Sequence, residues 1–572
     1  MSAFKNEKIH SLCKKKCNHE YINTTPVALV IDSFTKDTAG YVKEWILKTP
    51  YETFNGNTIE ELIELFNKIT NELDLKVKSE YNKDTIIIYT DNVAKCYGFL
   101  HNYYDNIETF SSYYMTIDCI EIRDITTFFK VNIIDIYKKV DYILEHAKVL
   151  IDTIFIEDNY FYITPVQKVR KDIKKNYTED KFELFPVNKH EYDNLYQTYI
   201  GGFCICNYPK LDVRKNVIEV DRKSAYIYDL LIEKHISETP HEENSEYFDY
   251  YIQDDDYYVQ SLLKITFSGA SHGYELFKDI FDKPIKPNET CYIRINDIDF
   301  KVLQSLCRNL EYECVNMKIA KKDYLPRYIA EVIEREYIKK VELEKTKPNS
   351  AELRLQKIIL NGIYGSLVKK IQTDFFTEKE NAYVSPYWGV LTTSYARKNL
   401  LLLAQQLKQW LYTDTDSIYC VQCEENYEII KNYNKDIAIK VNNYCIKNNL
   451  SYDIFRELGK FVEKGIFKRF KANGKKQYMH TDIYGNFELV ASGITKKYGE
   501  EAYKLNELER GMVKVGYITD DVTSCVVNGT TYTSNGSYFE KDEEFDDKLR
   551  AKLYLANSLF RREKQIWEEE NK

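Results

Sequence analysis

The first part of the chain alternates short apolar runs with polar and helical stretches. Between residues 24 and 165, the runs at 27–31 and 85–89 are almost entirely apolar and are followed by polar residues. Runs of this length are typical of buried strands. Strands that alternate with helical stretches indicate an α/β domain.

Later parts of the chain predict long helices and turn-rich connections. Residues 324–345 and 352–364 have the pattern of two helices, the first of them highly charged, separated by the turn residues 348–350. The acidic and Tyr-rich stretch 235–260 predicts a surface insertion. Residues 528–536 are rich in turn signals, and residues 541–572 indicate a charged, amphipathic helix.

Length and composition exclude several classes of protein. The chain has 572 residues, 44% hydrophobic and 30% charged, which is typical of a folded protein of about four domains. It has no run of eighteen apolar residues and no apolar secretion signal, so no membrane association is expected. Thirteen Cys are too few for a disulfide scaffold. The net charge of −9 excludes a polybasic nucleic-acid coat but allows an enzyme with a local basic channel.

The strongest local pattern is a short acidic centre with apolar residues on both sides, at residues 411–419. It predicts a β-hairpin, and Asp414 and Asp416, two positions apart, project from the same face of a strand. Carboxylates held together repel each other unless a cation lies between them, and hard oxygen ligands suit Mg²⁺. A solvated turn is the alternative for this pattern taken alone.

Two more patterns carry candidate chemistry. Residues 216–221 predict a strand that ends in Asp221, which can share a metal with the hairpin; the alternative is a cap of the next helix. On the helix predicted at 352–364, Lys357, Asn361 and Tyr364 share one face. On one face, a cation can bind a triphosphate, an amide can contact a template and an aromatic ring can pack on a base. An ordinary amphipathic helix fits the pattern equally well.

In this order, the three patterns resemble the motifs of family B DNA polymerases. Motif A is matched by Asp221-x-x-Ser224-x-Tyr226, motif B by Lys357-x-x-x-Asn361-x-x-Tyr364-Gly365, and motif C by Tyr412-Thr413-Asp414-Thr415-Asp416-Ser417. Tyr199-x-Gly201-Gly202 precedes motif A, like the motif that links exonuclease and polymerase domains, and Lys476-x-Tyr478 follows motif C, like the motif at the primer terminus. One departure is Ile227, where family members usually carry Pro.

The spacing of the motifs narrows the resemblance further. The 136 positions from Asp221 to Lys357 leave room for an insertion between palm and fingers. Motif order, length and this insertion are most similar to the protein-primed DNA polymerases of phages and linear plasmids. The second insertion of that family is short here, with 48 residues between Gly365 and Asp414. High processivity and strong strand displacement are therefore not implied.

The resemblance implies a multidomain α/β and α+β fold. It is the right hand of palm, fingers and thumb, preceded by an exonuclease-like domain of the RNase H-like type. The expected segments are the exonuclease-like domain (1–190), the first part of the palm (191–235), an insertion resembling the terminal-protein-interacting region (236–325), the fingers (326–366), the shortened second insertion with the rest of the palm (367–480), the thumb (481–540) and a helical extension (541–572).

The resemblance also implies roles for the motif residues. Asp221 and Asp416 hold two Mg²⁺ ions, for which Mn²⁺ can substitute, with Asp414 beside them. Lys357 neutralises the triphosphate, with Lys340 or Lys345 as a candidate second cation. The other expected contacts are the sugar for Tyr226, the incoming base for Tyr364, the templating pair for Asn361 and Ser224, and the template or primer for Tyr199, Gly201, Gly202, Lys476 and Tyr478.

The N-terminal region resembles the family's 3′–5′ exonuclease domain, but three of its four metal carboxylates are replaced. Asp32 is kept, whereas Phe34, Cys96 and His146 stand where Glu, Asp and Asp are usual. A site with one carboxylate cannot hold two metals, so loss of proofreading is expected. The alternative is a shifted alignment, because Asp37, Asp91 and Glu145 lie close to these positions.

The sequence therefore predicts a DNA-directed DNA polymerase in the host cytoplasm, encoded by a phage or linear plasmid. Its expected partners are template, primer, dNTPs and a terminal protein whose hydroxyl accepts the first nucleotide. One alternative is a polymerase that extends nucleic-acid primers or starts without a primer. A second alternative is an inactive, polymerase-derived nucleic-acid-binding protein.

Overall fold

The computed structural model divides the chain into two compact units. The first comprises Met1–Lys171, Lys339–Gly362 and Thr519–Asp521, and the second comprises the rest. This division is coarser than the seven predicted segments, whose limits stay predictions. The structure describes residues 25–36, 39–72, 77–79, 82–83, 86–101, 103–104, 107–110, 114–117, 119–131, 133–154, 165–177, 189–206, 211–270, 288–367, 385–474, 476–491, 514–515, 524–527, 530–533 and 538–539.

The first unit is built on a seven-stranded sheet. Its strands run in the order β3 (Thr53–Gly56), β2 (Ala39–Lys48), β1 (Ala28–Lys36), β6 (Ile86–Thr90), β9 (Ile120–Asp124), β8 (Tyr114–Ile117) and β7 (Ile107–Phe110). The central strands β1, β6 and β9 are parallel. The two strands predicted from apolar runs are therefore confirmed as β1 and β6.

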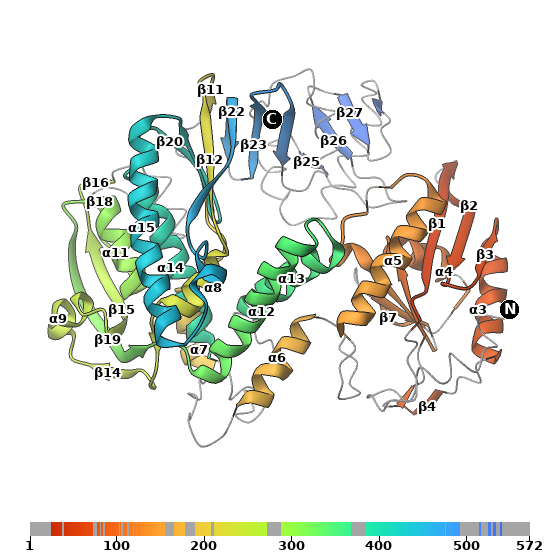
Figure 1. The fold of residues 1–572 in the computed structure, drawn as a ribbon, viewed down its shortest axis with the longest axis horizontal. Helices are drawn as coiled ribbons and strands as arrows, with labels where there is room; N and C mark the ends of the chain where they lie inside the picture. Colours follow the sequence, from red (N-terminus) through yellow and green to blue (C-terminus); the bar gives the residue numbers. More distant parts are fainter. Residues whose placement is uncertain are drawn as a thin grey trace. The chain divides into compact units, whose positions relative to one another are not determined.

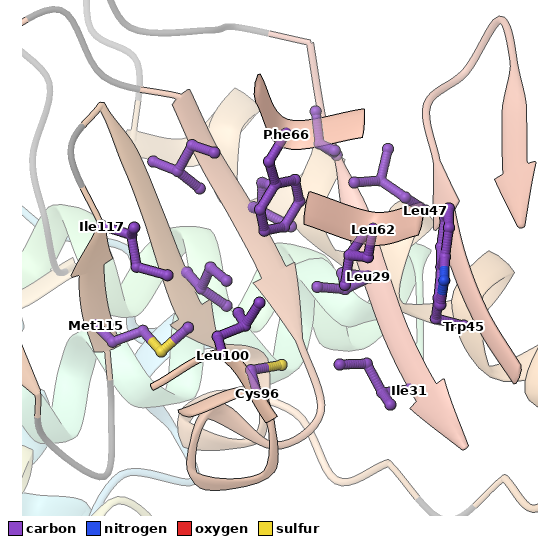
Figure 2. Close-up of a cluster of buried hydrophobic side chains, with 14 of the residues drawn as sticks. Leu29, Ile31, Trp45, Leu47, Leu62, Phe66, Cys96, Leu100, Met115 and Ile117 are labelled. Atoms are coloured by element: carbon purple, nitrogen blue, oxygen red, sulfur yellow. The ribbon is translucent and has the colours of Figure 1, made fainter. Parts of the chain in front are cut away.

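Helices cover both faces of this sheet, which explains why β1 and β6 are apolar on both sides. The helices are α3 (Ile59–Glu72), α4 (Val93–Leu100) and α5 (Ile136–Ile154), with a 3-10 turn η1 (Ile125–Thr127) and the small hairpin of β4 (Val77–Ser79) and β5 (Asn82–Lys83). The side chains of Leu29, Leu62, Phe66 and Leu100 from β1, α3 and α4 form one core cluster (Figure 2). α6 (Pro165–Asn176) follows and is divided between the units.

The main sheet of the second unit brings distant parts of the chain side by side (Figure 1). The order is β10 (Cys204–Cys206), β20 (Trp410–Asp414), β21 (Ser417–Val421), β12 (Val217–Arg222), β22 (Phe461–Gly474), β23 (Gln477–Asp482) and β24 (Phe487–Ala491), with β11 (Leu211–Val213) paired to β22. All its pairs are antiparallel. Because β12 lies between β21 and β22, Asp221 lies beside the predicted hairpin.

Helices bury one face of this sheet. They are α7 (Lys189–Tyr196), α8 (Ala225–Ile232), α14 (Pro386–Ala404), α15 (Glu424–Lys447) and the short α16 (Tyr452–Phe455). Ile218 and Val220 of β12 pack with Leu400 of α14 and Ile430 of α15. This apolar packing against the helices holds β12, the strand that carries Asp221, in place.

A second sheet follows α8. It orders β13 (His235–Ile236), β19 (Glu311–Asp323), β15 (Tyr257–Thr266) and β17 (Cys291–Asn296), with β14 (His241–Glu243) on β19. It is accompanied by η2 (Ser245–Tyr247), α9 (Phe248–Gln253), α11 (Asp297–Leu306) and the pair of β16 (Gly269–Ala270) and β18 (Cys307–Arg308). The predicted surface insertion is wrong at both ends, because His235 and Ile236 of β13 are buried in this sheet, as are Tyr258 and Val259 of β15.

The two predicted helices are confirmed as α12 (Arg327–Thr346) and α13 (Ala351–Leu367), and each is divided between the units. Near the end of the chain, β25 (Lys514–Val515), β26 (Ser524–Val527), β27 (Thr530–Thr533) and β28 (Tyr538–Phe539) form a small sheet. The helix predicted at 541–572 lies outside the described residues. Within the described part of the chain, no helix combines the length and apolarity needed to cross a membrane.

Candidate active site

The predicted β-hairpin exists, with a two-residue turn at Thr415 and Asp416. Thr415 has a φ of 63° and donates its backbone N–H to the carbonyl of Phe203 over 2.7 Å. Asp416 donates its N–H to the carbonyl of Asp414, also over 2.7 Å. Because Asp416 lies in the turn, the expectation that both carboxylates project from one strand face is wrong. The turn geometry, and not strand alternation, sets their positions.

Strand pairing brings the third carboxylate to this turn. Asp221 is opposite Ser417 in the register of β12 and β21, and the next residue, Arg222, donates its N–H to the carbonyl of Asp416 over 2.8 Å. Asp221 does not cap the following helix, since Ser224 precedes α8. The strand-end position predicted for Asp221 is therefore confirmed.

The nearby carboxylates affect the pKa of Asp416. Burial, followed by repulsion from Asp221 and Asp414, raises the pKa of the Asp416 carboxyl to about 6. Clustered hard oxygen ligands whose charges repel one another fit Mg²⁺ or Mn²⁺, because a divalent cation would offset that repulsion. Asp221, Asp416 and Asp414 are thus the residues that could hold the metals.

Two lysines are bound to the same carboxylates. The Nζ of Lys464 lies 3.1 Å from the Oδ2 of Asp221, and the Nζ of Lys476 donates to the Oδ1 of Asp414. Cys204, opposite Asp414 on β10, donates its Sγ–H to the same Oδ1 over 3.1 Å. Among the described residues, no three His, Cys, Asp or Glu side chains converge as a metal site. Asp221 and Asp414 are thus each paired with one ammonium group.

Three tyrosines contact one another near the carboxylates. The ring of Tyr226 on α8 stacks on that of Tyr364 at a centroid distance of 4.2 Å and an angle of 17°. The hydroxyls of Tyr364 and Tyr199 are 3.1 Å apart. Burial raises the pKa of both Tyr226 and Tyr364. The structure thus brings residues predicted from three separate motifs together.

The glycines before β10 differ in their surroundings. A Cβ on Gly202 would approach the Oγ1 of Thr415 to 3.1 Å, whereas a Cβ on Gly201 meets only the Tyr199 hydroxyl at 3.7 Å. A side chain at Gly202 would thus crowd the Thr415 side chain in the turn of the hairpin. The predicted approach of both glycines to a template strand stays a prediction.

The two residues of the Lys-x-Tyr pair differ in burial: the lysine is partly exposed and the tyrosine is buried. Lys476 has a φ of 53°, and its side chain is 44% exposed. Tyr478 is buried against Tyr412, and its hydroxyl lies 3.3 Å from that of Tyr419. Only Lys476 offers a large exposed group to a primer. Lys475, which directly precedes this pair, lies outside the described residues.

Lys357 and Asn361 lie on the part of α13 that belongs to the first unit, so their predicted roles stay predictions. Both are exposed. Lys357 lies 3.3 Å from Glu344 of α12, which also pairs with Lys340 over 2.9 Å. Within this unit, Lys357 and Lys340, two of the three candidate triphosphate contacts, therefore share one carboxylate.

The exonuclease-like positions contain no carboxylate cluster in the described part of the first unit. Cys96 points into the apolar core beside Leu100 (Figure 2), and burial raises the pKa of its thiol to about 12. The ring of His146 is buried and stacks on Tyr142 at 3.7 Å. Asp32 lies on β1, 3.2 Å from the Nζ of Lys43. Phe34 is part of β1, but its side chain lies outside the description.

Lys95 lies against β1 next to Asp32. The Nζ of Lys95 donates to the carbonyl of Ile31 over 3.1 Å, and burial lowers the pKa of this amine. Of the alternative carboxylates, Asp91 is paired with Lys139 over 2.9 Å, Glu145 is exposed, and Asp37 lies outside the described residues. Sequence reasoning missed Lys95 and Lys464. For Lys464, the signal was Gly465 inside a strand, which often marks a bulge.

Of the comparisons with known proteins, the one with solved structures identifies the fold. No protein-family model matches the chain, and no curated protein matches it in sequence. Phi29 DNA polymerase complexed with primer-template DNA and incoming nucleotide substrates matches with a TM-score of 0.60 and 16% identity, over 91% of this chain and 99% of that chain. Its complex with primer-template DNA after translocation gives 0.61 and 16%, over 90% and 100%. Its complex with single-stranded DNA gives 0.59 and 17%, over 91% and 100%.

These matches confirm the resemblance at the level of the fold, since the identity is too low to carry more. The fold is mixed α/β and extends over nearly the whole of both chains. This chain therefore has the fold of phi29 DNA polymerase.

Proposed function

We propose that this chain is a DNA-directed DNA polymerase that adds nucleotides from dNTPs to a primer hydroxyl. The observation that carries the proposal is the meeting of Asp221 with the Asp414–Asp416 hairpin on neighbouring strands, in a chain with this fold. A protein that only binds nucleic acid has no use for three carboxylates that repel one another. The inactive, polymerase-derived binder is therefore the weaker alternative.

The chain's own residues would divide the work of nucleotide transfer. Asp221 and Asp416 would hold two divalent ions, which supply a lower pKa for the attacking hydroxyl and charge compensation for the pyrophosphate. Lys357 would neutralise the triphosphate. The Tyr226 ring, held by its stack on Tyr364, would exclude a sugar with a 2′-hydroxyl. Asn361 and Ser224 would lie near the templating pair.

The priming mode is a finer part of the proposal. We propose priming by the hydroxyl of a terminal protein, because the fold is that of phi29 DNA polymerase and the sequence order is that of the protein-primed group. The sheet of β13, β14, β15, β17 and β19 is the expected docking region. A polymerase that extends nucleic-acid primers, or starts without one, remains the alternative.

We also propose that the exonuclease-like domain does not proofread. Two-metal hydrolysis needs several carboxylates around the metals. Cys96 and His146 are buried, and the Lys95 ammonium adds a positive charge beside Asp32. The domain would then serve to guide the template or to dock the priming protein.

Primer extension tests the proposal. A 5′-labelled primer–template is incubated with the full chain and Mg²⁺, with and without dNTPs. Extension by the wild type and its loss in Asp416→Asn are expected, while the exposed Asp436→Asn on α15 serves as the matched control. Without dNTPs the primer should stay intact. Absence of extension from both a nucleic-acid primer and a terminal protein would contradict the proposal.

A further inference from the structure

A β-bulge aims one lysine at the candidate metal site. In the antiparallel pair of β12 and β22, Glu219 is opposite Gly465, and Val220 is opposite Glu463. Lys464 is therefore the extra residue of a bulge, with no partner in the register. Bulges redirect side chains and are common next to active sites.

The redirected side chain is bound to Asp221. The Nζ of Lys464 lies 3.1 Å from the Oδ2 of this carboxylate, and the two side chains are 40% and 26% exposed. The pair is thus accessible from solvent and can open. None of the motifs that carry the polymerase resemblance includes Lys464.

A cation on Asp221 competes with a metal for the same carboxylate. A divalent ion that binds Asp221 must displace the ammonium or accept a positive charge a few ångströms away, and like charges repel at that range. A nucleotide changes this balance, because its triphosphate brings negative charge for the displaced lysine and for the metal.

We propose that Lys464 is a resident countercation of Asp221 that weakens binding of free divalent metal and so couples metal loading to the arrival of the nucleotide triphosphate. The inference rests on the proposed function, since it concerns the same carboxylates. It assigns Lys464 a positioning role: the ammonium holds Asp221 in the absence of metal and yields it when the nucleotide arrives.

Direct Mn²⁺ binding to the full chain, without DNA, tests this role. Free Mn²⁺ is measured by electron paramagnetic resonance during a titration. Lys464→Met removes the charge at similar length, Lys464→Arg keeps it, and Lys431→Met removes an ammonium from a comparable pair with Glu428 at 2.8 Å on α15. Thermal unfolding of each variant checks that it is folded.

Lys464→Met should bind Mn²⁺ about three- to fivefold more tightly than the wild type, the range that a half-exposed ion pair can account for. Lys464→Arg and Lys431→Met should resemble the wild type. With dNTP added, the difference between Lys464→Met and the wild type should shrink. In primer extension, Lys464→Met should reach half-maximal rate at a lower Mg²⁺ concentration.

Two results would overturn the inference: Mn²⁺ binding by Lys464→Met that is equal to or weaker than that of the wild type, or the same gain in Lys431→Met. Failure of the proposed function is a different result. It would be seen as no primer extension by the wild type, together with Mn²⁺ binding that Asp416→Asn leaves unchanged.

Discussion

Two regions of the molecule combine acidic residues with lysines, but they do so differently. One is the hairpin site, formed by β12 and the β20–β21 hairpin. The other is the β1 site of the first unit, at the ends of β1 and β6 near Asp32. On the hairpin side, Lys464 and Lys476 bind the carboxylates from the rim and are 40% and 44% exposed. On the β1 side, Lys95 donates to the main chain of Ile31, and burial lowers its pKa. The two exposed lysines have room to move away from their carboxylates, whereas Lys95 is held by the main chain of β1.

The two sites also differ in what surrounds the motif positions. Asp416 keeps a carboxylate despite the burial and repulsion that raise its pKa to about 6. Cys96 and His146, in contrast, have been absorbed into packing, one in the apolar core and one in a stack with Tyr142. The hairpin site thus keeps carboxylates whose charges repel one another, whereas at the β1 site two of the motif positions hold packed side chains without a carboxylate.

The largest expected effect separates the two sites by activity. Asp416→Asn should lower the rate of primer extension by about a thousandfold or more, because a metal ligand that stabilises the transition state is lost. Asp32→Asn should leave both extension and primer integrity unchanged. The measurement is single-turnover extension on a labelled primer. Primer shortening by the wild type that disappears in Asp32→Asn would break the comparison.

A stability measurement probes the β1 site. Cys96→Asp should lower the free energy of unfolding by roughly 3 kcal/mol, because it buries a carboxyl in an apolar cluster. Cys96→Ala, the matched control, should cost about 1–2 kcal/mol from the lost volume. Urea unfolding of the full chain followed by circular dichroism gives both values. Equal stability of Cys96→Asp and the wild type would mean that this position still accepts a metal ligand.

A smaller effect concerns the pH dependence of the hairpin site without divalent ions. The pKa of Asp416 is about 6 in the folded chain, above its usual 3.8, so ionising it costs stability as the pH rises through this range. Asp416→Asn should therefore be more stable than the wild type by roughly 2 kcal/mol at pH 8, and the difference should vanish near pH 4. Thermal unfolding at the two pH values, with Asp436→Asn as control, measures it. A difference that grows towards low pH would contradict the assigned cause.

Much of the fold and of the hairpin site could be predicted from the sequence, because the signals are local. Apolar runs marked β1 and β6, and the acidic centre between apolar flanks marked the hairpin with Asp414 and Asp416. The reason given for their proximity was wrong, since a positive φ at Thr415 places Asp416 in the turn. Local patterns thus identified the residues but not the backbone geometry that positions them.

The lysines could not be predicted because their roles depend on tertiary register. Lys464 reaches Asp221 only through a bulge between two strands that are more than two hundred residues apart in the chain. Lys95 reaches Ile31 only because α4 packs against β1. The burial of β15 at the end of the predicted insertion was missed for a similar reason. β15 is an interior strand because it pairs with β19 on one side and with β17 on the other, and both of these strands come later in the sequence.

The most direct test of the central claim is to map where metal binds. Fe²⁺ replaces Mg²⁺ in the full chain with primer–template and dNTP, and hydroxyl radicals produced with ascorbate and peroxide cut the backbone next to the bound iron. Mass spectrometry then locates the cuts. The account predicts cuts near Asp221 and residues 414–416 that Asp416→Asn abolishes, and none near Asp32 or residues 91–96. Cuts at Asp32 and Asp91 would contradict it, because they would show that the exonuclease-like site still holds metal.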